Sequence, residues 1–125
     1  MISEKIYGSK IWYIPDGFSP SDGLDLNDSH ESICIINDTN MAANIKITLF
    51  FEDEDPVENI GYKLMQKRCK HLRLNDPKNL GGYKLKANKP YAIKLVSDVE
   101  IIVQYSRLTS NNDKFTLMTT IGYSV

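Results

Sequence analysis

Apolar residues recur along this chain in short runs that are separated by turn-forming residues. From Asn44 to Glu52 they occupy alternate positions, at Ile45, Ile47, Leu49 and Phe51. Because successive side chains of a β-strand point to opposite faces, this alternation predicts a strand with one buried face. The segment Ser32 to Asn37 contains four consecutive apolar residues, which predicts a strand that is buried on both faces.

Eight segments have the character of strands, and no segment has a convincing helical period. The predicted strands are Ile11 to Ile14, Ser32 to Asn37, Asn44 to Glu52, Gly61 to Gln66, Cys69 to Leu74, Tyr91 to Ser97, Glu100 to Leu108 and Phe115 to Ser124. Short strands at such regular intervals favour an all-β fold, an antiparallel β-sandwich or a small barrel. A chain of 125 residues is long enough for one core, so we expect a single domain over residues 1–125.

Two polar segments are predicted to be exposed loops. The first, Ser19 to Ser29, is rich in Ser, Pro, Asp and Gly, which bury little surface. The second, Glu52 to Asp55, has four consecutive acidic residues and is followed by Pro56. Like charges repel and proline cannot donate to a strand ladder, so this segment should end the strand before it.

Composition and charge exclude several classes of protein. The apolar fraction of 42% is typical of a globular domain, and 15 basic against 16 acidic residues leave a net charge of −1. No general field therefore attracts nucleic acid, which is not an expected partner. No apolar run approaches a membrane span or the core of a secretory leader, so we expect a cytoplasmic protein. Cys34 and Cys69 are then expected to be reduced, buried small hydrophobes.

Polar residues inside the strand segments are the main candidates for function. Leu72 and Leu74 can point into a core while His71, Arg73 and Asn75 form a row on the opposite face. Gln104 lies inside an apolar stretch, where it needs hydrogen-bond partners. Arg107 follows that stretch, and its planar fork suits carboxylates, phosphates and sugar hydroxyls. The alternative for Arg107 is a structural salt bridge with Glu31 or Asp76.

Two further features point to a binding surface. His30 and Glu31 directly precede a buried strand, at a strand mouth where binding residues of sandwiches commonly lie. Trp12 has a flat apolar face that could stack on a sugar ring, although it could equally be a core residue with a satisfied N–H.

Catalytic and metal motifs are weak. His30, His71 and Glu31 could supply two nitrogens and one oxygen to a metal, but they lack the spacing of a known ligand motif. Cys69 and His71 would share a strand face, yet a structural cysteine beside a surface histidine is the simpler interpretation. There is no phosphate-binding glycine loop and no nucleophile elbow. We therefore expect neither an enzyme nor a bound metal or cofactor.

Several short motifs together resemble the sensory rhodopsin transducer family. They are W-x-I-x-D-G-F from Trp12, S-H-E from Ser29, C-I-x-N from Cys34, K-H-x-R-x-N-D from Lys70, I-V-Q-x-x-R-L from Ile102 and T-I-x-Y from Thr120. Each is weak alone, but they span nearly the whole chain in the order found in the family.

The resemblance implies an eight-stranded β-sandwich that assembles as a homotetramer. The family's founding member is a cytoplasmic partner of a membrane rhodopsin and has been linked to DNA, whereas most relatives are thought to bind small molecules such as sugars. The resemblance to the family does not by itself imply a rhodopsin partner for this chain. The polar positions shared with the family are His30, Glu31, Asn37, His71, Arg73, Asn75, Asp76, Gln104 and Arg107. Two departures lie beside Arg107, where Tyr105 replaces a histidine and Thr109 replaces an aspartate.

Three hypotheses from different classes remain. The favoured one is a non-enzymatic domain that binds a small polar metabolite, such as a carbohydrate, among His30, Glu31, His71, Arg73 and Arg107, with Trp12 or Tyr105 stacking on the ligand. The second is a transducer or scaffold that acts through protein contacts, with Phe50, Tyr62 and Tyr83 as exposed aromatic residues and DNA-linked regulation as a variant. The third is an enzyme that uses a His/Glu or Cys/His pair.

Overall fold

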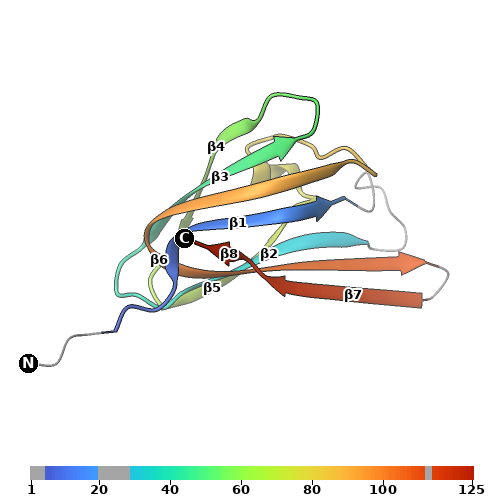
Figure 1. Cartoon of the computed structure of the whole chain (residues 1–125). Helices are drawn as coiled ribbons and strands as arrows, with labels where there is room; N and C mark the ends of the chain where they lie inside the picture. The colour runs from blue at the N-terminus through green and yellow to red at the C-terminus, as the bar shows by residue number, and fades with distance from the viewer. Residues whose placement is uncertain (1–4, 20–28, 112–113) are drawn as a thin grey trace, which may run out of the picture.

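The chain folds into two stacked antiparallel sheets that share one long strand (Figure 1). The structure is a computed structural model, and it describes residues 5–19, 29–111 and 114–125. The elements are β1 (Ser9–Phe18), β2 (His30–Asn37), β3 (Ala43–Phe51), β4 (Val57–Leu64), β5 (Arg68–Arg73), the 3₁₀-helix η1 (Pro77–Leu80), β6 (Pro90–Asn111), β7 (Lys114–Ile121) and β8 (Tyr123–Ser124). The predicted all-β antiparallel sandwich is confirmed.

Strand β6 belongs to both sheets because its two halves pair with different neighbours. Its first half pairs with β1 and β3 in a sheet of order β4-β3-β6-β1-β8. From Ile102 onward it pairs with β2 and β7, and β5 adds to β2 to give the order β5-β2-β6-β7. We call these sheets A and B. Figure 1 shows β6 bending back at one end of the molecule, so that its two halves lie one over the other.

The predicted strand count of eight is correct, but the chain is divided into strands differently at two places, and β1 and β4 begin earlier than predicted. The segments Tyr91 to Ser97 and Glu100 to Leu108 are one continuous strand. The segment Phe115 to Ser124 is divided at Gly122, where the chain leaves β6 to pair with β1. A Cβ atom on Gly122 would lie 3.0 Å from Cε3 of Trp12, so this glycine allows the change of partner close to the indole.

The core lies between the sheets and follows the predicted alternation. Its buried aliphatic residues come from both inner faces, among them Ile45, Ile47, Leu49, Leu72, Leu74, Ile93, Leu95 and Val103. Strand β2 differs from the prediction, since Cys34 is half-buried and Ile36 is 45% exposed. Only the inner face of β2 is fully buried, and the four apolar residues in a row arise because the outer positions 34 and 36 also carry apolar residues. Cys69 is exposed, so the prediction that both cysteines are buried is also wrong.

The two predicted loops have different outcomes. The acidic segment is exposed as predicted, but Glu54 makes ion pairs with Lys86 and Lys89 that tie it to the chain before β6. In the segment Ser19 to Ser29, residues 20–28 lie outside the described part of the chain, and both flanking serines are buried. Among the described residues, no helix has the length and apolar character needed to cross a bilayer.

Candidate functional site

A buried carboxylate lies at the end of the sandwich opposite the bend of β6. Glu31 is on the inner face of β2 and only 2% exposed. Its Oε1 accepts a hydrogen bond from the Tyr91 hydroxyl at 2.9 Å, and its Oε2 accepts one from the backbone N–H of Phe18 at 2.8 Å. Oε2 also accepts a hydrogen bond from the Tyr105 hydroxyl. Three protein donors therefore compensate for the water that a buried carboxylate loses.

The hydrogen-bond directions in this cluster are fixed by chemistry. A phenol has one proton, and both Tyr91 and Tyr105 donate theirs to Glu31. Burial, followed by the negative charge of Glu31, raises the pKa of both tyrosines above the usual value. The oxygen of Tyr105 is then left as an acceptor, which is what the neighbouring arginine requires.

Arg107 is held in place by contacts with Asp16, Phe18 and Tyr105. Its Nε donates to the Tyr105 hydroxyl at 3.1 Å, and its Nη2 donates to the backbone oxygen of Asp16 at 3.1 Å. The Asp16 carboxylate is 3.7 Å from Nη2. The guanidinium carbon lies 5.7 Å from the ring centre of Phe18 and 5.6 Å from that of Tyr105, within cation–π range. Asp16, rather than Glu31 or Asp76, is thus its ion-pair partner.

A hollow of about 390 Å³ adjoins this cluster through Asp16. It lies between β1 and the β7–β8 segment, and its lining is Tyr13, Ile14, Pro15, Asp16, Met118, Thr120, Ile121 and Tyr123. Asp16 reaches it because the ladder between β1 and β6 is interrupted between Ile14 and Gly17. Such a bulge redirects side chains at the edge of a sheet. Aromatic and aliphatic walls with a carboxylate and hydroxyls are the composition of many small-molecule sites.

The structure divides the predicted site residues between two faces of sheet B. Glu31 and Arg107 oppose each other on the inner face. Because side chains alternate along a strand, His30 and Cys34 lie on the outer face of β2. Cys34 pairs directly with His71 and with Gln104, so these two residues are on the outer face as well. Arg73, opposite Ser32, follows the same outer row. The five ligand contacts first predicted therefore do not surround one pocket in a single chain.

The outer face of sheet B has a shallower hollow of its own. It measures about 170 Å³, and its lining includes Cys34, Cys69, His71, Gln104, Ile36 and Ile102. Gln104 is exposed here, so the prediction that it needs buried partners is wrong. No three side chains among the described His, Cys, Asp and Glu residues form a group that could hold a metal ion.

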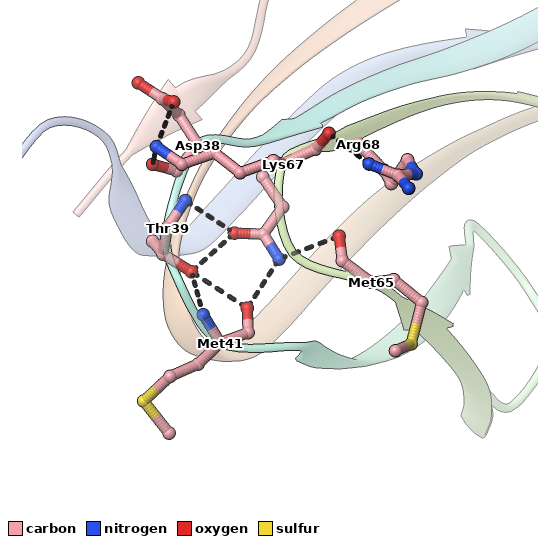
Figure 2. Close-up of polar contacts among 7 residues, drawn as sticks. Asp38, Thr39, Met41, Met65, Lys67 and Arg68 are labelled. Atoms are coloured by element: carbon pink, nitrogen blue, oxygen red, sulfur yellow. Dashed lines mark hydrogen bonds and ion pairs between the residues drawn. The ribbon is translucent and has the colours of Figure 1, made fainter.

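Three of the predicted residues organise loops. Asn37 is buried, and its side-chain amide donates to the backbone oxygens of Met41, Leu64 and Met65 at 2.8–3.2 Å. Its Oδ1 accepts from the backbone N–H and the hydroxyl of Thr39. Figure 2 shows this network joining the loop after β2 to the turn before β5. Asn37 thus fixes two loops at the end of the molecule remote from Arg107.

Asn75 and Asp76 have similar local roles after β5. The Oδ1 of Asn75 accepts from Nε of Arg73 at 3.3 Å. Asp76 caps the 3₁₀-helix η1 by accepting from the backbone N–H of Lys78. These bonds account for both residues without a ligand.

Trp12 belongs to the core. It is 5% exposed, and its Nε1 donates to the backbone oxygens of Ser9 and Ile101 at 2.9 and 3.0 Å. The indole is therefore not available to stack on a ligand in this chain, and the core alternative is the correct one. The predicted exposed aromatic residues also differ from one another, since Phe50 is exposed while Tyr62 and Tyr83 are half-buried against the core.

Sequence reasoning missed several residues that shape the hollow. Asp16 was assigned to a turn because Pro15-Asp16-Gly17 has turn composition, whereas β1 continues through it to Phe18. Tyr13 and Tyr123, which line the hollow, were not selected because tyrosine is an ordinary strand residue. The signal that could have indicated a site here was the presence of Glu31 and Arg107 in strands, because a buried charged group needs a hydrogen-bond partner or an opposite charge nearby.

The fold and this cluster define a class of small β-sandwich domains in which a buried carboxylate, hydrogen-bonded by two tyrosine hydroxyls, lies near an arginine at one end of the sandwich. The chain belongs to the Anabaena sensory rhodopsin transducer family, whose model matches residues 7–124. A protein from Thermotoga maritima, numbered 1070, has a crystal structure that is similar over 96% of this chain and 97% of its own, with 38% identity and a TM-score of 0.83. The Anabaena sensory rhodopsin transducer is similar over 86% of this chain and 95% of its own, with 29% identity and a TM-score of 0.72. No match was found among curated proteins.

Proposed function

We propose that this protein is a non-enzymatic domain that binds a small polar metabolite, such as a carbohydrate, in signalling or metabolism. The observation that carries the proposal is the position of Asp16, which both pairs with Arg107 and lines the aromatic hollow. Arg107 is oriented by two rings and two hydrogen bonds, so little freedom is lost when a ligand binds nearby.

The charges at this end favour a neutral or cationic ligand over an anion. Asp16 is the one charged side chain in the lining of the hollow, its partner Arg107 is also bonded to Tyr105, and the ammonium of Lys94 lies over the ring of Tyr13. An anion placed in the hollow would be repelled by Asp16, whose side chain is 82% exposed. Hydroxyl groups can instead donate to Asp16, and the rings of Tyr13 and Tyr123 can contact the apolar face of a sugar.

Thermal unfolding with a library of neutral sugars, amino sugars and sugar acids tests this function. A ligand at 100 times its dissociation constant adds about 2.7 kcal/mol, which shifts the midpoint by several degrees for a domain of this size. We expect a hit that is lost in Asp16→Asn and Tyr123→Ser and kept in His71→Ala. Both Asp16 and Tyr123 have exposed side chains, so these variants should fold.

The matched control is His71→Ala, because His71 lines only the outer hollow. A hit that is lost in His71→Ala and kept in Asp16→Asn would move the site to the outer face of sheet B. Absence of any hit, with saturable binding also absent by calorimetry, would overturn the binding function.

We propose that no chemical step follows binding. The two histidines lie on the outer face and Glu31 on the inner face, so neither histidine pairs with Glu31 within one chain. NMR spectra of the ligand after long incubation with the protein should be unchanged. A new product signal would contradict this part of the proposal.

We further propose a homo-oligomer, a tetramer by family resemblance, that works in the cytoplasm. The exposed apolar side chains of Phe115, Leu117, Ile121 and Tyr123 support self-association. The exposed thiol of Cys69 supports a reducing compartment. Light scattering should give four times the mass of the chain, and a strict monomer at micromolar concentration would contradict assembly.

A second candidate function is that of a transducer acting through protein contacts. The observation that favours it is the exposure of Ile36 and Ile102 on the outer face of sheet B, where polar residues are the rule. Ile36→Lys should abolish binding to a protein partner while leaving sugar-induced stabilisation unchanged. The DNA-linked variant requires binding that weakens steeply with salt, and flat salt dependence would exclude it.

A further inference from the structure

A second large hollow, of about 370 Å³, lies at the end of the sandwich where β6 bends, remote from Arg107 (Figure 1). Three segments that are far apart in the chain surround it, namely residues 5–7 before β1, residues 38–41 after β2, and residues 99–102 of β6. Its volume is within the range of small-molecule sites. Among the described residues, it has no lining residue in common with the hollow beside Asp16, so it is a separate candidate site.

The walls of this hollow are apolar side chains that remain accessible to solvent. Large apolar residues line it from all three segments and are 37–73% exposed, namely Ile6, Tyr7, Ile36, Met41 and Ile102. Exposed apolar side chains gathered around a concave surface are typical of a binding site. Methionine suits such a wall, because its unbranched and polarisable side chain adapts to the shape of an apolar ligand.

Two of the surrounding segments are held in place by contacts behind the hollow. Gly8 has a φ of 91°, and a Cβ atom there would lie 2.4 Å from the backbone oxygen of Ile101. Only glycine therefore lets the segment before β1 lie against the bend of β6. The loop after β2 is held by Asn37, which bonds to Thr39 and Met41 (Figure 2). Walls that are already fixed reduce the entropy lost when a ligand binds.

The charged side chains in the lining are Lys5, Asp38 and Glu100. Asp38 is paired with Lys67 at 3.0 Å, so its charge is compensated within the protein. In the described part of the chain, the side chains of Lys5 and Glu100 form neither an ion pair nor a hydrogen bond, with each other or with other residues. The hollow therefore has one positive and one negative group that remain to be paired, beside apolar walls.

We propose that this hollow binds a free α-amino acid with an apolar side chain, such as leucine, methionine or phenylalanine. Glu100 accepts hydrogen bonds from the ammonium group, Lys5 donates to the carboxylate, and the apolar walls contact the side chain. A simple anion or cation would pair with only one of the two charged groups. A neutral sugar would pair with neither and would bring its hydroxyl groups against apolar walls. This site does not depend on the sugar site proposed above.

Calorimetric titration with L-leucine and its truncated analogues tests the ligand class. Isoamylamine lacks the carboxylate, isocaproate lacks the ammonium group, and glycine lacks the apolar side chain. We expect saturable binding of leucine that is tighter than that of each analogue by about fivefold, since each analogue loses one set of contacts worth about 1 kcal/mol. Glycine that binds as tightly as leucine would overturn the role of the apolar walls. Absence of saturable heat with leucine, methionine and phenylalanine would overturn the proposal.

Two variants test which group each side chain binds. Glu100→Gln should weaken the binding of leucine and isoamylamine about fivefold and leave isocaproate unchanged. Lys5→Gln should weaken leucine and isocaproate and leave isoamylamine unchanged. Glu58→Gln and Lys63→Gln remove the same charges from exposed positions of β4, and these matched controls should bind leucine as the wild type does. Unchanged leucine affinity in both Glu100→Gln and Lys5→Gln would overturn the site.

A last comparison separates this site from the proposed sugar site. Asp16→Asn should keep the leucine affinity of the wild type, because Asp16 lines the other hollow. Loss of leucine binding in Asp16→Asn, with binding kept in Glu100→Gln, would place the amino acid beside Asp16 and overturn the assignment. Failure to find any sugar, with leucine binding still dependent on Glu100 and Lys5, would instead reject the sugar function and leave the amino-acid site intact.

Discussion

Gly17 lies against the hydroxyl-bearing end of the Tyr91 ring. A Cβ atom on Gly17 would be 2.8 Å from Cζ of Tyr91, closer than such contacts occur. The absence of a side chain at this position lets the Tyr91 hydroxyl reach Glu31. Gly17 in sheet A therefore leaves the space that the hydrogen bond from Tyr91 to Glu31 in sheet B requires.

Replacing this glycine should destabilise the protein. In Gly17→Ala the ring must shift and its bond to Glu31 is strained or lost, at a cost of about 1–3 kcal/mol. Urea unfolding measures the effect. Gly61→Ala is the control, since a Cβ there meets no atom within 4 Å, and it should be neutral or stabilising by up to about 1 kcal/mol. Equal stability of the two variants would contradict this account.

The buried carboxylate is expected to be intolerant of an isosteric amide. Glu31→Gln places an NH₂ group either against the Phe18 N–H or against the Tyr91 hydroxyl, which must then accept and leaves its own proton unpaired. Leaving such groups unpaired in the interior costs about 3 kcal/mol, because the lost bonds are charge-assisted. Glu58→Gln on the exposed surface of β4 should change the free energy of unfolding by less than about 0.5 kcal/mol. A Glu31→Gln protein as stable as that control would refute the assigned hydrogen bonds.

Asn37 should be as important to stability as a core residue. Asn37→Ala removes a donor from the backbone oxygens of Met41, Leu64 and Met65, of which that of Met41 keeps the Thr39 hydroxyl, at about 2–3 kcal/mol. Hydrogen exchange should rise in both loops that it joins. Asn40→Ala, at an exposed position three residues further along, is the control and should be near neutral. Faster exchange in one loop alone would show that Asn37 does not couple them.

Alkaline conditions should unfold the protein through its tyrosines. The folded-state pKa values of Tyr91 and Tyr105 are raised by burial and then by Glu31, so the folded state holds these protons more tightly than the unfolded state. The two tyrosines stabilise the fold fully below a pH of about 10, and this stabilisation is lost as the pH rises through their folded-state pKa values. Tyrosinate absorbance should therefore include two residues that ionise only with unfolding, and Tyr105→Phe should remove one of them.

Acid should weaken the ion pairs of Glu54 with Lys86 and Lys89, which join the loop after β3 to the chain before β6. Hydrogen bonds from Lys89 and Lys86 lower the pKa of Glu54 from 4.5 to about 2. Because the pKa of Glu54 is lower in the folded state, this group stabilises the fold at pH values above its unfolded-state pKa. The stabilisation is lost as the pH falls from the unfolded-state pKa through the folded-state pKa. Glu54→Gln should flatten the pH dependence of the unfolding midpoint between pH 4.5 and about 2. Glu52→Gln, in the same exposed segment, should keep the wild-type slope.

Local periodicity predicted the existence of the strands but not their continuity. Alternation in β3 was sufficient, because its outer positions are mostly polar. It failed for β2, where Cys34 and Ile36 occupy outer positions and hide the period. It also failed at the centre of β6, because Ser97 and Asp98 resemble a turn although the strand runs through them. Whether a polar pair ends a strand depends on tertiary pairing, which local sequence does not contain.

The site was predictable residue by residue but not as an arrangement. Glu31 was identified from its position at a strand mouth, and Arg107 from the planar guanidinium that follows an apolar stretch. The assignment of His30 to the same pocket as Glu31 ignored the alternation of adjacent side chains, which sends them to opposite faces. Asp16 could not be identified, since its role depends on a bulge in β1 and on the register with β6.

The sharing of β6 by both sheets has a consequence for the order of folding. Strands β1, β2 and β3 precede β6 in the chain, and each depends on it for a ladder. Of the strand pairs present in the described structure, only β3 with β4 and β2 with β5 can form before β6 is available. A topology dominated by such distant contacts folds slowly, in milliseconds to seconds for two-state domains. On the ribosome, sheet A lacks its central strand until residue 101 has emerged, and sheet B lacks its central strand until residue 108 has emerged, so the sandwich forms late.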